Sequence, residues 1–386
     1  MKIAFFTDSY RPYTSGVVRS IETFTTELNR LGHQVYIFAP QYKGCEKEPG
    51  VFRYASVPSP TNQDFSVAIP ISLKARPLVK KLGLDIIHVH SPFMLGRLGA
   101  RLARLERIPL VYTYHTLYDK YVHYVPFAQE LSSKVVQKLA TDFSNRCDLV
   151  IVPTKVIGDI IRENGVKTSI VNIPTGIDLS GYGEGDPEWL RKTYRIPAGH
   201  RILLFVGRIG QEKNLEFLIR CYVKVQQEIP QTTLALVGGG PQEQELKELV
   251  AALGVSDKVI FTGTLDKKSV INCYHGADLF VFASVTETQG LVIGEAKAAG
   301  LPVVAVDAFG VKEMVEHEQS GYLTRLDEQE FVERILTLLT DHSLYNQMSA
   351  SAKEQAQHIS SEACALRLVE AYEEILRAKN RVVVGY

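Results

Sequence analysis

The sequence predicts an α/β protein with two domains, each built on a parallel sheet. Its length of 386 residues suits two domains of ordinary size. Short apolar runs alternate with helical patterns along the whole chain, which is typical of parallel sheets with helices on both faces. Most of these runs are continuous stretches of Val, Ile, Leu and Phe, as expected for strands that are buried on both faces.

Each half of the chain supplies its own set of strands, and no internal sequence repeat relates the two halves. The strands expected in the first half are Lys2–Phe6, Val35–Ala39, Asp85–Val89, Leu110–Tyr114, Leu149–Val152 and Ser169–Ile173. Those expected in the second half are Ile202–Val206, Thr233–Val237, Lys258–Phe261, Leu279–Ala283 and Val303–Val306.

Helix and linker signals complete the outline. Apolar residues from Val17 to Leu31 recur at helical spacing and Gly32 follows as a stop, so a first helix is expected there. The segment Ser180–Pro187 is rich in turn formers and is the best linker candidate. We therefore expect domains at residues 1–180 and 181–361. A last helix is expected from about Glu362 to Ala378.

Composition excludes several classes of protein. The 43 basic residues balance the 43 acidic ones, so no global field favours nucleic acid, and an anionic partner must be met by a local patch. Five scattered cysteines without a Cys-x-x-Cys pair fit a reducing cytoplasm rather than a disulfide framework or a zinc site. The apolar run at the start of the chain is too short for the hydrophobic region of a signal peptide. No stretch of eighteen apolar residues appears, so no membrane-spanning helix is expected.

Two cations follow the first strand of the second half. Arg208 comes directly after Phe205-Val-Gly, and Lys213 follows five residues later. A diphosphate gathers negative charge as its bond to a sugar breaks, and fixed cations at a strand end could stabilise that charge. The alternative is a pair of solvated cations that flank a turn.

Two carboxylates, Glu287 and Glu295, lie eight residues apart at a predicted strand–helix junction. Gly290, Leu291 and Val292 open the helix, whose free amide groups favour an anion. Glu295 lies one turn inside the helix, where it could accept hydrogen bonds from both ribose hydroxyls, and Glu287 could reach sugar hydroxyls. Together with the two cations, this pair suggests a site for a nucleotide diphosphate that carries a sugar. The plain alternative is that Gly290 makes only a tight turn.

Two glycine turns could bring backbone close to the same ligand. Gly239 lies in the run Val237–Pro241, between a strand and a helix, although this run is not a dinucleotide fingerprint and could be an ordinary turn. Gly16 begins the first helix, where it leaves the helix terminus open to a ligand, and Ser15 could cap that helix.

His115 belongs to the aromatic run from Tyr112 to Tyr121, which follows a strand. The carboxyl end of a strand is where doubly wound folds bind ligands, so His115 is a candidate for a functional role. A lone histidine can equally be structural, and we assign a structural role to His88 and His90, which also end a strand.

A basic amphipathic helix is expected between Phe93 and Leu110. Its leucines lie opposite four arginines, Arg97, Arg101, Arg104 and Arg107. Eight basic and two acidic residues between Ile71 and Leu110 give this stretch a net charge of +6. Such helices can lie on anionic lipid surfaces. The alternative is a surface helix that packs its leucines on the sheet.

In combination, these residues resemble the retaining family-four glycosyltransferases of the GT-B fold. The matching pieces occur in the family's order over nearly the whole chain: Ser15-Gly16-Val17, His115, Pro174–Asp178, Gly207-Arg208 with Lys213, Gly238–Pro241, Gly263-Thr264, and Glu287 with Glu295. The chain departs from the family at Gln289, where many members have Phe, and at Ser15, where many have Gly.

The resemblance implies a fold and a set of roles. It implies two Rossmann-like domains facing a central cleft, with the nucleotide mainly on the second domain and the final helix (362–386) crossing back to the first. Arg208 and Lys213 would grip the diphosphate, and Glu295 would hold the ribose. Glu287 and the amides of Leu291 and Val292 would meet sugar and phosphate, and Thr264 and Leu265 would line the base pocket. Gly16 would lie under the phosphates, and His115 would contact the transferred sugar near the reaction centre. Gly239 and Gly290 are further donor-binding candidates.

Within the family, the runs Thr7–Pro12 and Thr286–Gly290 look most like bacterial diacylglycerol glucosyltransferases. That likeness implies glucose transfer from UDP-glucose to a lipid acceptor, by an enzyme of the cytoplasm that associates peripherally with the inner face of the cell membrane. No metal or other cofactor is expected, because the cations already neutralise charge and no Asp-x-Asp occurs. The alternatives are another donor (GDP-mannose or UDP-GlcNAc) with a soluble or inositol-type acceptor, a nucleotide-sugar epimerase, and a nonenzymatic membrane scaffold.

Overall fold

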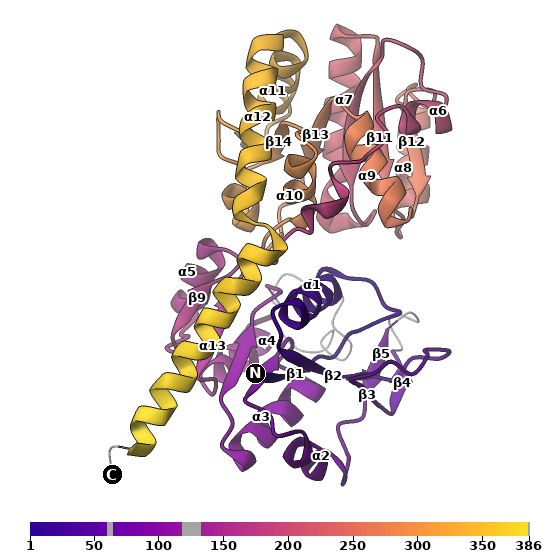
Figure 1. Ribbon diagram of the computed structural model, residues 1–386. Helices are drawn as coiled ribbons and strands as arrows, with labels where there is room; N and C mark the ends of the chain where they lie inside the picture. The colour runs from indigo at the N-terminus through magenta and orange to yellow at the C-terminus, as the bar shows by residue number, and fades with distance from the viewer. Residues whose placement is uncertain (60–64, 118–132, 385–386) are drawn as a thin grey trace. The chain divides into compact units, whose positions relative to one another are not determined.

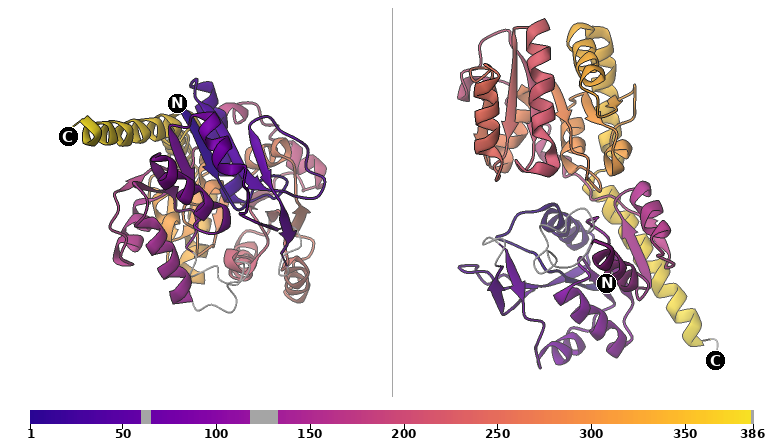
Figure 2. Two further views of the ribbon diagram at one scale, coloured as in Figure 1. Left: turned by 90° about the horizontal axis from the view of Figure 1, so that it is seen from below. Right: turned by 180° about the vertical axis from the view of Figure 1, so that it is seen from behind.

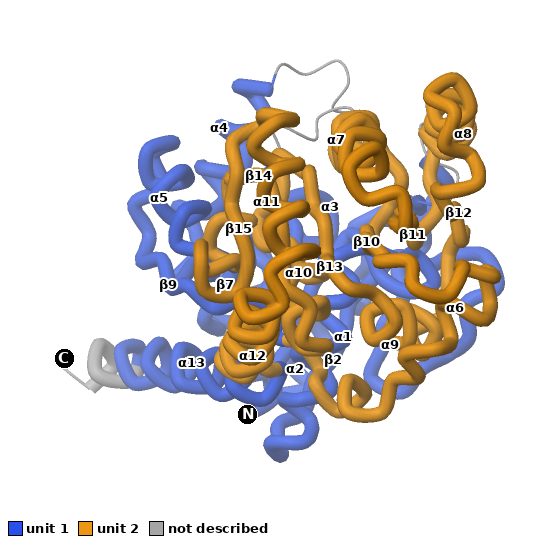
Figure 3. The backbone as a smooth tube through the Cα atoms, turned by 90° about the horizontal axis from the view of Figure 1, so that it is seen from above, with its two compact units in different colours: residues 1–176, 361–386 blue, residues 177–360 orange. Residues whose placement is uncertain are grey.

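The computed structural model (Figure 1) describes residues 1–59, 65–117 and 133–384. The chain forms two compact units (Figure 3): residues 1–176 with 361–386 make unit 1, and residues 177–360 make unit 2. Each unit contains a parallel sheet with helices packed against it, so the predicted α/β class is confirmed. Tyr118 and Tyr121 of the predicted aromatic run lie outside the described residues.

The described part of unit 1 holds a seven-stranded parallel sheet in the order β3-β2-β1-β6-β7-β8-β9. Its strands are β1 (Lys2–Phe6), β2 (Gln34–Pro40), β3 (Val51–Tyr54), β6 (Ile86–Val89), β7 (Leu110–Thr113), β8 (Leu149–Val152) and β9 (Ile170–Asn172). Every residue of β6, β7 and β8 is buried, which explains their continuous apolar sequences. The described helices of this unit are α1 (Gly16–Arg30), α2 (Ala75–Leu82), α3 (Met94–Glu106), α4 (Ser133–Ser144), α5 (Lys155–Glu163) and α13 (Ser361–Val384).

Helix α1 begins and ends where the sequence predicts. The Oγ of Ser15 accepts a hydrogen bond from the Val18 amide at 3.3 Å, which makes Ser15 the predicted N-cap. Gly32, with a φ of +83°, follows the last turn as the predicted stop. An added Cβ at Gly16 would meet nothing within 4 Å, so the start of this helix is open.

Helix α13 packs against α1 in unit 1 and is longer than predicted. Cys364, Ala365, Leu368 and Tyr372 are buried in the same core cluster as residues of β1 and α1. The Ser361 hydroxyl donates to Oε1 of Glu27 at 2.7 Å. The C-terminal turns of α13 project beyond the rest of unit 1 in every view (Figures 1 and 2).

The described part of unit 2 holds a six-stranded parallel sheet in the order β12-β11-β10-β13-β14-β15. Its strands are β10 (Arg201–Val206), β11 (Thr232–Val237), β12 (Val259–Gly263), β13 (Leu279–Phe282), β14 (Val303–Val306) and β15 (Gly321–Thr324). Its helices are α6 (Trp189–Thr193), α7 (Leu215–Glu228), α8 (Glu243–Ala252), α9 (Lys267–Gly276), α10 (Leu291–Ala298), α11 (Glu328–Thr340) and α12 (His342–His358), with 3₁₀ turns at Leu179–Gly181, Gln211–Lys213 and Phe309–Glu313.

Sequence patterns missed four strands. β3 and β15 lie at sheet edges, and β4 (Ser56–Pro58) pairs with β5 (Ser66–Ala68) in a separate antiparallel ribbon. These strands are only three or four residues long, and β3 and β4 are mostly half-buried or exposed. Such segments lack the continuous apolar run by which the central strands are recognised.

Candidate functional site

The strand order of unit 2 defines where a ligand can bind. The chain runs outward from β10 to β11 and β12 on one side, and then returns to β13 on the other. β10 and β13 are therefore neighbours at a topological switch point, and doubly wound sheets bind ligands beyond the carboxyl ends of such strands. Arg208 follows β10, and Ser284 and Glu287 follow β13. The sequence-predicted cations and the first carboxylate thus meet at this edge of the sheet.

Lys213 and Glu287 form an ion pair at the switch point. Their side chains are 15% and 16% exposed, so the pair is shielded from bulk water but remains reachable. The Oγ of Ser284 lies 3.2 Å from Oε1 of Glu287 and 2.9 Å from the Glu212 carbonyl oxygen, and it thereby ties the loop after β13 to the loop after β10. This arrangement places one cation and one carboxylate in contact, 74 residues apart in sequence.

The glycines of the turn after β11 allow two backbones to approach each other. An added Cβ at Gly238 would lie 1.9 Å from the Gly207 carbonyl oxygen, and one at Gly240 would lie 2.1 Å from that of Ile209. The amides of Gly207 and Ile209 donate in turn to carbonyl oxygens of this run. Glycine is thus required at positions 238 and 240, because any side chain there would push this turn away from the loop that carries Arg208.

Gly239 faces the loop after β12. An added Cβ at Gly239 would lie 3.1 Å from Oγ1 of Thr264. Thr264 is exposed and Leu265 is half-buried. Gly239 and the two residues predicted to line the base pocket therefore follow adjacent strands, β11 and β12, at the carboxyl ends of the strands of unit 2.

Helix α10 begins at the same edge. Gly290 precedes it with a φ of +86°, a left-handed conformation that favours glycine. The first amides of any helix have no partner inside the helix, and here they belong to Leu291 and Val292. Glu295 is 4% exposed, and the Tyr274 hydroxyl donates to its Oε2 at 2.8 Å. The bond to Tyr274 thus holds the carboxylate of Glu295, which has little exposed surface.

His115, which is predicted to contact the transferred sugar, belongs to unit 1. It lies beyond the carboxyl end of β7, which neighbours β6 in the sheet. Its Nε2 lies 2.9 Å from Nδ1 of His90, which follows β6. Burial lowers the pKa of His115 to about 3, so this imidazole is neutral at physiological pH.

His88 and His90, to which the sequence analysis assigns a structural role, lie beside His115 in the same sheet. The ring of His88 stacks on that of His90 at 4.4 Å, and His88 also lies 2.6 Å from the Thr113 hydroxyl. Burial is the main cause that lowers the pKa of both histidines well below the usual value, and the neighbouring rings lower it further. The order of the strands, in which β6 and β7 are neighbours, brings these two histidines next to His115.

Helix α3 presents the predicted basic face to solvent. Arg97, Arg101 and Arg104 of α3 and Arg107, which follows the last residue of the helix, are all exposed, whereas Leu95 and Leu102 are buried. The alternative in which the leucines pack on the sheet is therefore correct for those two leucines, and the arginines remain available. Glu106, at the end of α3, pairs with Arg76 and Lys80 of α2 and joins the two helices.

Exposed apolar residues precede α2. Ile71 is 82% exposed and Leu73 is 96% exposed. Lys74, Lys80 and Lys81 follow them on the surface. This short apolar segment is thus continuous with a basic one.

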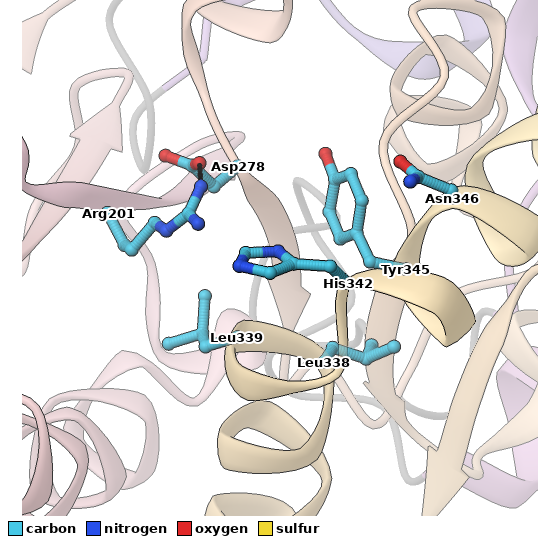
Figure 4. Close-up of a pocket in the computed structure, with 7 residues that line it drawn as sticks. All are labelled: Arg201, Asp278, Leu338, Leu339, His342, Tyr345 and Asn346. Carbon is cyan, nitrogen blue, oxygen red and sulfur yellow. Dashed lines mark hydrogen bonds and ion pairs between the residues drawn. The ribbon is translucent and has the colours of Figure 1, made fainter.

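A separate pocket of about 180 Å³ lies near the amino ends of β10 and β13 (Figure 4). Its walls carry Arg201, paired with Asp278 at 2.8 Å, together with His342 and Tyr345. Because Arg201 begins β10 and Asp278 precedes β13, this pocket lies at the amino ends of the strands, whereas Arg208 follows a carboxyl end. It does not belong to the candidate site.

Among the described residues, no group of three or more His, Cys, Asp or Glu side chains is arranged to hold a metal ion. Nor do the described helices include one with both the length and the apolar character needed to cross a bilayer.

Comparison with known proteins identifies the family. Residues 14–180 match Glycosyltransferase Family 4, and residues 187–355 match Glycosyl transferases group 1. The alpha-monoglucosyldiacylglycerol synthase of Streptococcus pneumoniae is 34% identical over 98% of this chain and 87% of the relative. The enzyme of the same name from Acholeplasma laidlawii is 30% identical over 99% of each chain.

A solved structure supports the fold. Anabaena Alr3699/HepE in complex with UDP-glucose superposes with a TM-score of 0.77 and 23% identity, over 97% of this chain and 100% of that chain. These matches confirm the family resemblance seen in the sequence. The chain is a glycosyltransferase, and it belongs to the family-four glycosyltransferases of the GT-B fold.

Proposed function

We propose that this glycosyltransferase moves glucose from UDP-glucose to diacylglycerol at a membrane surface, with retention of the anomeric configuration. The observation that carries the proposal is the meeting of Arg208, the Lys213–Glu287 pair and the first turn of α10 at the switch point of unit 2. That edge combines fixed cations with helix amides, which is the chemistry that a nucleotide diphosphate requires.

The donor would be held by its charged and hydroxyl groups. Arg208 and Lys213 would face the diphosphate, and the amides of Leu291 and Val292 would donate to a phosphate oxygen. Glu295 would accept from the ribose hydroxyls. The ion pair keeps the ammonium of Lys213 in place before the donor arrives, so little reorganisation is needed when charge develops on the diphosphate.

The transfer step then needs no protein nucleophile. The bond between the anomeric carbon and the diphosphate oxygen breaks, and a bond to the acceptor hydroxyl oxygen forms on the same face of the sugar. The acceptor proton passes to an oxygen of the departing phosphate. Arg208 and Lys213 stabilise the charge that this phosphate gains, and they contribute most if their bonds tighten in the transition state. Glu287 would orient sugar hydroxyls, and neutral His115 would contact the transferred sugar.

The lipid acceptor is supported by the surface of unit 1 and by the printed names of the two relatives. The exposed arginines of α3, together with Arg107 after it, could meet anionic headgroups, at about 1 kcal/mol for each basic residue near the surface. Ile71 and Leu73 could enter the acyl region, since each exposes almost its whole side chain. The protein would then lie peripherally on the inner face of the cell membrane.

The deciding experiment offers several donors to several acceptors. UDP-glucose, UDP-GlcNAc and GDP-mannose are each incubated with diacylglycerol in anionic vesicles, with a soluble sugar, with an inositol phosphate, and without acceptor. We expect an α-glucosyl lipid from UDP-glucose and diacylglycerol, with the anomer assigned by NMR. A soluble glycoside, an epimerised donor, or a β-linked product would each contradict a separate part of the proposal.

A further inference from the structure

Three histidines form a stacked row at the carboxyl ends of the strands of unit 1, in which His88 and His90 are buried and His115 is half-buried. The ring centroids of His88 and His90 lie 4.4 Å apart, and those of His90 and His115 lie 5.2 Å apart with 21° between their planes. Phe5 packs its ring against His90 at 4.7 Å in an edge-on arrangement. The ring of His90 is therefore fixed from both sides, and its Nδ1 points at Nε2 of His115.

Only one of the two facing nitrogens can carry a proton. When two neutral imidazoles form a hydrogen bond, one ring donates and the other accepts. Nε2 of His90 is buried and has no hydrogen-bond partner among the described residues. A proton at that Nε2 would leave a buried N–H without an acceptor, and such orphaned donors are rare in proteins.

The remaining arrangement places the proton of His90 on Nδ1. His90 then donates to Nε2 of His115 and leaves only a bare lone pair in the interior. Since Nε2 of His115 accepts this bond, the proton of His115 must be on Nδ1. We propose that His90 is a positioning residue that holds His115 as the neutral Nδ1–H tautomer, with its Nδ1–H as a hydrogen-bond donor of fixed direction.

This inference deepens the proposed function and rests on it only for its kinetic consequence. A neutral Nδ1–H can donate but cannot accept, so the group that His115 meets is a hydrogen-bond acceptor such as a sugar oxygen. Without His90, the ring of His115 could rotate or change tautomer. Misplacement of one contact by about 1 Å can cost about a hundredfold in rate.

The test of the tautomer uses the resting protein and does not depend on activity. Histidine labelled with nitrogen-15 is introduced, and the signals of His115 are assigned with a His115→Asn variant. We expect long-range proton–nitrogen correlations of the Nδ1–H tautomer in the wild type and in His90→Asn, because the Asn amide can replace the Nδ1 donor. In His90→Leu we expect a mixture of tautomers. An Nε2–H tautomer in the wild type, or an unchanged His115 in His90→Leu, would overturn the proposal.

The test has one control variant and one alternative comparison. Tyr372→Phe removes a bond to His88 in the same row, 2.6 Å long, and should leave the tautomer of His115 unchanged. If His90→Leu fails to fold, the wild type and His90→Asn still decide the tautomer.

Kinetics then separate this inference from the proposed function. We expect His90→Leu to lower kcat at least about tenfold with little change in the KM for the donor, and His90→Asn to restore most of it. The Nδ1–H tautomer with normal kcat in His90→Leu would refute the role of His115 at the sugar while leaving the tautomer assignment intact. A different tautomer would refute the inference whatever the activity.

Discussion

The hydroxyl of Tyr372 lies 2.6 Å from Nδ1 of His88, although 284 residues separate them in sequence. Tyr372 belongs to α13 and His88 to β6, and both side chains are fully buried. Burial raises the pKa of Tyr372 well above its usual value, so the phenol stays protonated. The bond joins the last helix to the central strands of unit 1.

This bond should contribute measurably to stability. Tyr372→Phe leaves a buried nitrogen of His88 without its partner, which should cost about 1–3 kcal/mol in the free energy of unfolding. Urea unfolding followed by circular dichroism measures this loss. The control is Tyr36→Phe, whose exposed hydroxyl bonds to Gln34 at 3.2 Å and should change stability by less than about 0.5 kcal/mol. Equal effects of the two substitutions would show that the buried bond contributes nothing.

Donor turnover should depend on both cations at the switch point. Arg208→Ala and Lys213→Ala should each lower kcat/KM at least about tenfold, since a charge-assisted hydrogen bond contributes about 1.5–3 kcal/mol. Steady-state kinetics at saturating acceptor measure this effect, with circular dichroism to check the fold. Lys247→Ala, which breaks a surface ion pair on α8, is the matched control. Near-normal turnover in the Arg208 and Lys213 double variant would show that these two cations do not stabilise the departing diphosphate.

Stability should fall on acidification because the buried histidines are neutral in the folded state. Unfolding restores the pKa of His115 from about 3 to about 6.5, so below that value the unfolded chain binds more protons than the folded one. The free energy of unfolding therefore decreases as the pH falls from 6.5 toward 3, by up to about 1.4 kcal/mol per pH unit for each such histidine.

Urea titrations at pH 7.5, 6 and 5 measure this slope. His115→Asn should reduce it, because one titrating group is lost. Val111→Ala makes a cavity in the neighbouring strand β7, and it should lower stability equally at every pH. A slope that is identical in the wild type and His115→Asn would contradict the neutral assignment of His115.

Activity should persist in the presence of a chelator. Arg208, Lys213 and the helix amides at the switch point can balance the charge of the diphosphate. We therefore expect kcat in EDTA to stay within about twofold of its value without EDTA. The measurement compares metal-free buffer, EDTA, and added magnesium or manganese. Complete loss in EDTA that either metal restores would show that the protein's own charges are insufficient.

Membrane binding should depend on the basic face of α3. Changing Arg97, Arg101, Arg104 and Arg107 to Gln should weaken sedimentation with anionic vesicles. Salt should weaken binding of the wild type, because exposed charges are screened over about 10 Å at 0.1 M. Donor affinity should not change, since most of the predicted donor residues belong to unit 2 and none of the four arginines is among them. The matched control changes four exposed basic residues of unit 2 to Gln: Arg220, Lys224, Lys247 and Arg325.

A second variant tests the apolar segment of the same surface. Ile71→Ser with Leu73→Ser should weaken binding to neutral and anionic vesicles alike, because apolar insertion does not depend on lipid charge. If the wild type and both variants bind all vesicles equally, α3 is an ordinary solvated face. The lipid acceptor would then be supported by family likeness alone.

The sequence by itself determined the class of the fold and most central strands. Lys2–Phe6, Leu149–Val152 and Val303–Val306 have the predicted limits, because a strand is apolar along the whole length that is buried on both faces. The helix α1 was also readable, since its cap and its glycine stop are local signals. The residues that follow strand ends, such as Arg208 and His115, could be proposed because ligands bind there in doubly wound folds.

Only the tertiary structure decided which of these residues are partners. Lys213 with Glu287, His90 with His115, and Tyr372 with His88 each join segments that are distant in sequence. Such pairs depend on strand order and on the packing of α13, and the periodicity of a segment carries no information about its neighbours. The short strands β3 and β4 were missed for a related reason. They are stabilised by pairing with an adjacent strand, and a half-buried run of three or four residues has no pattern that predicts this pairing.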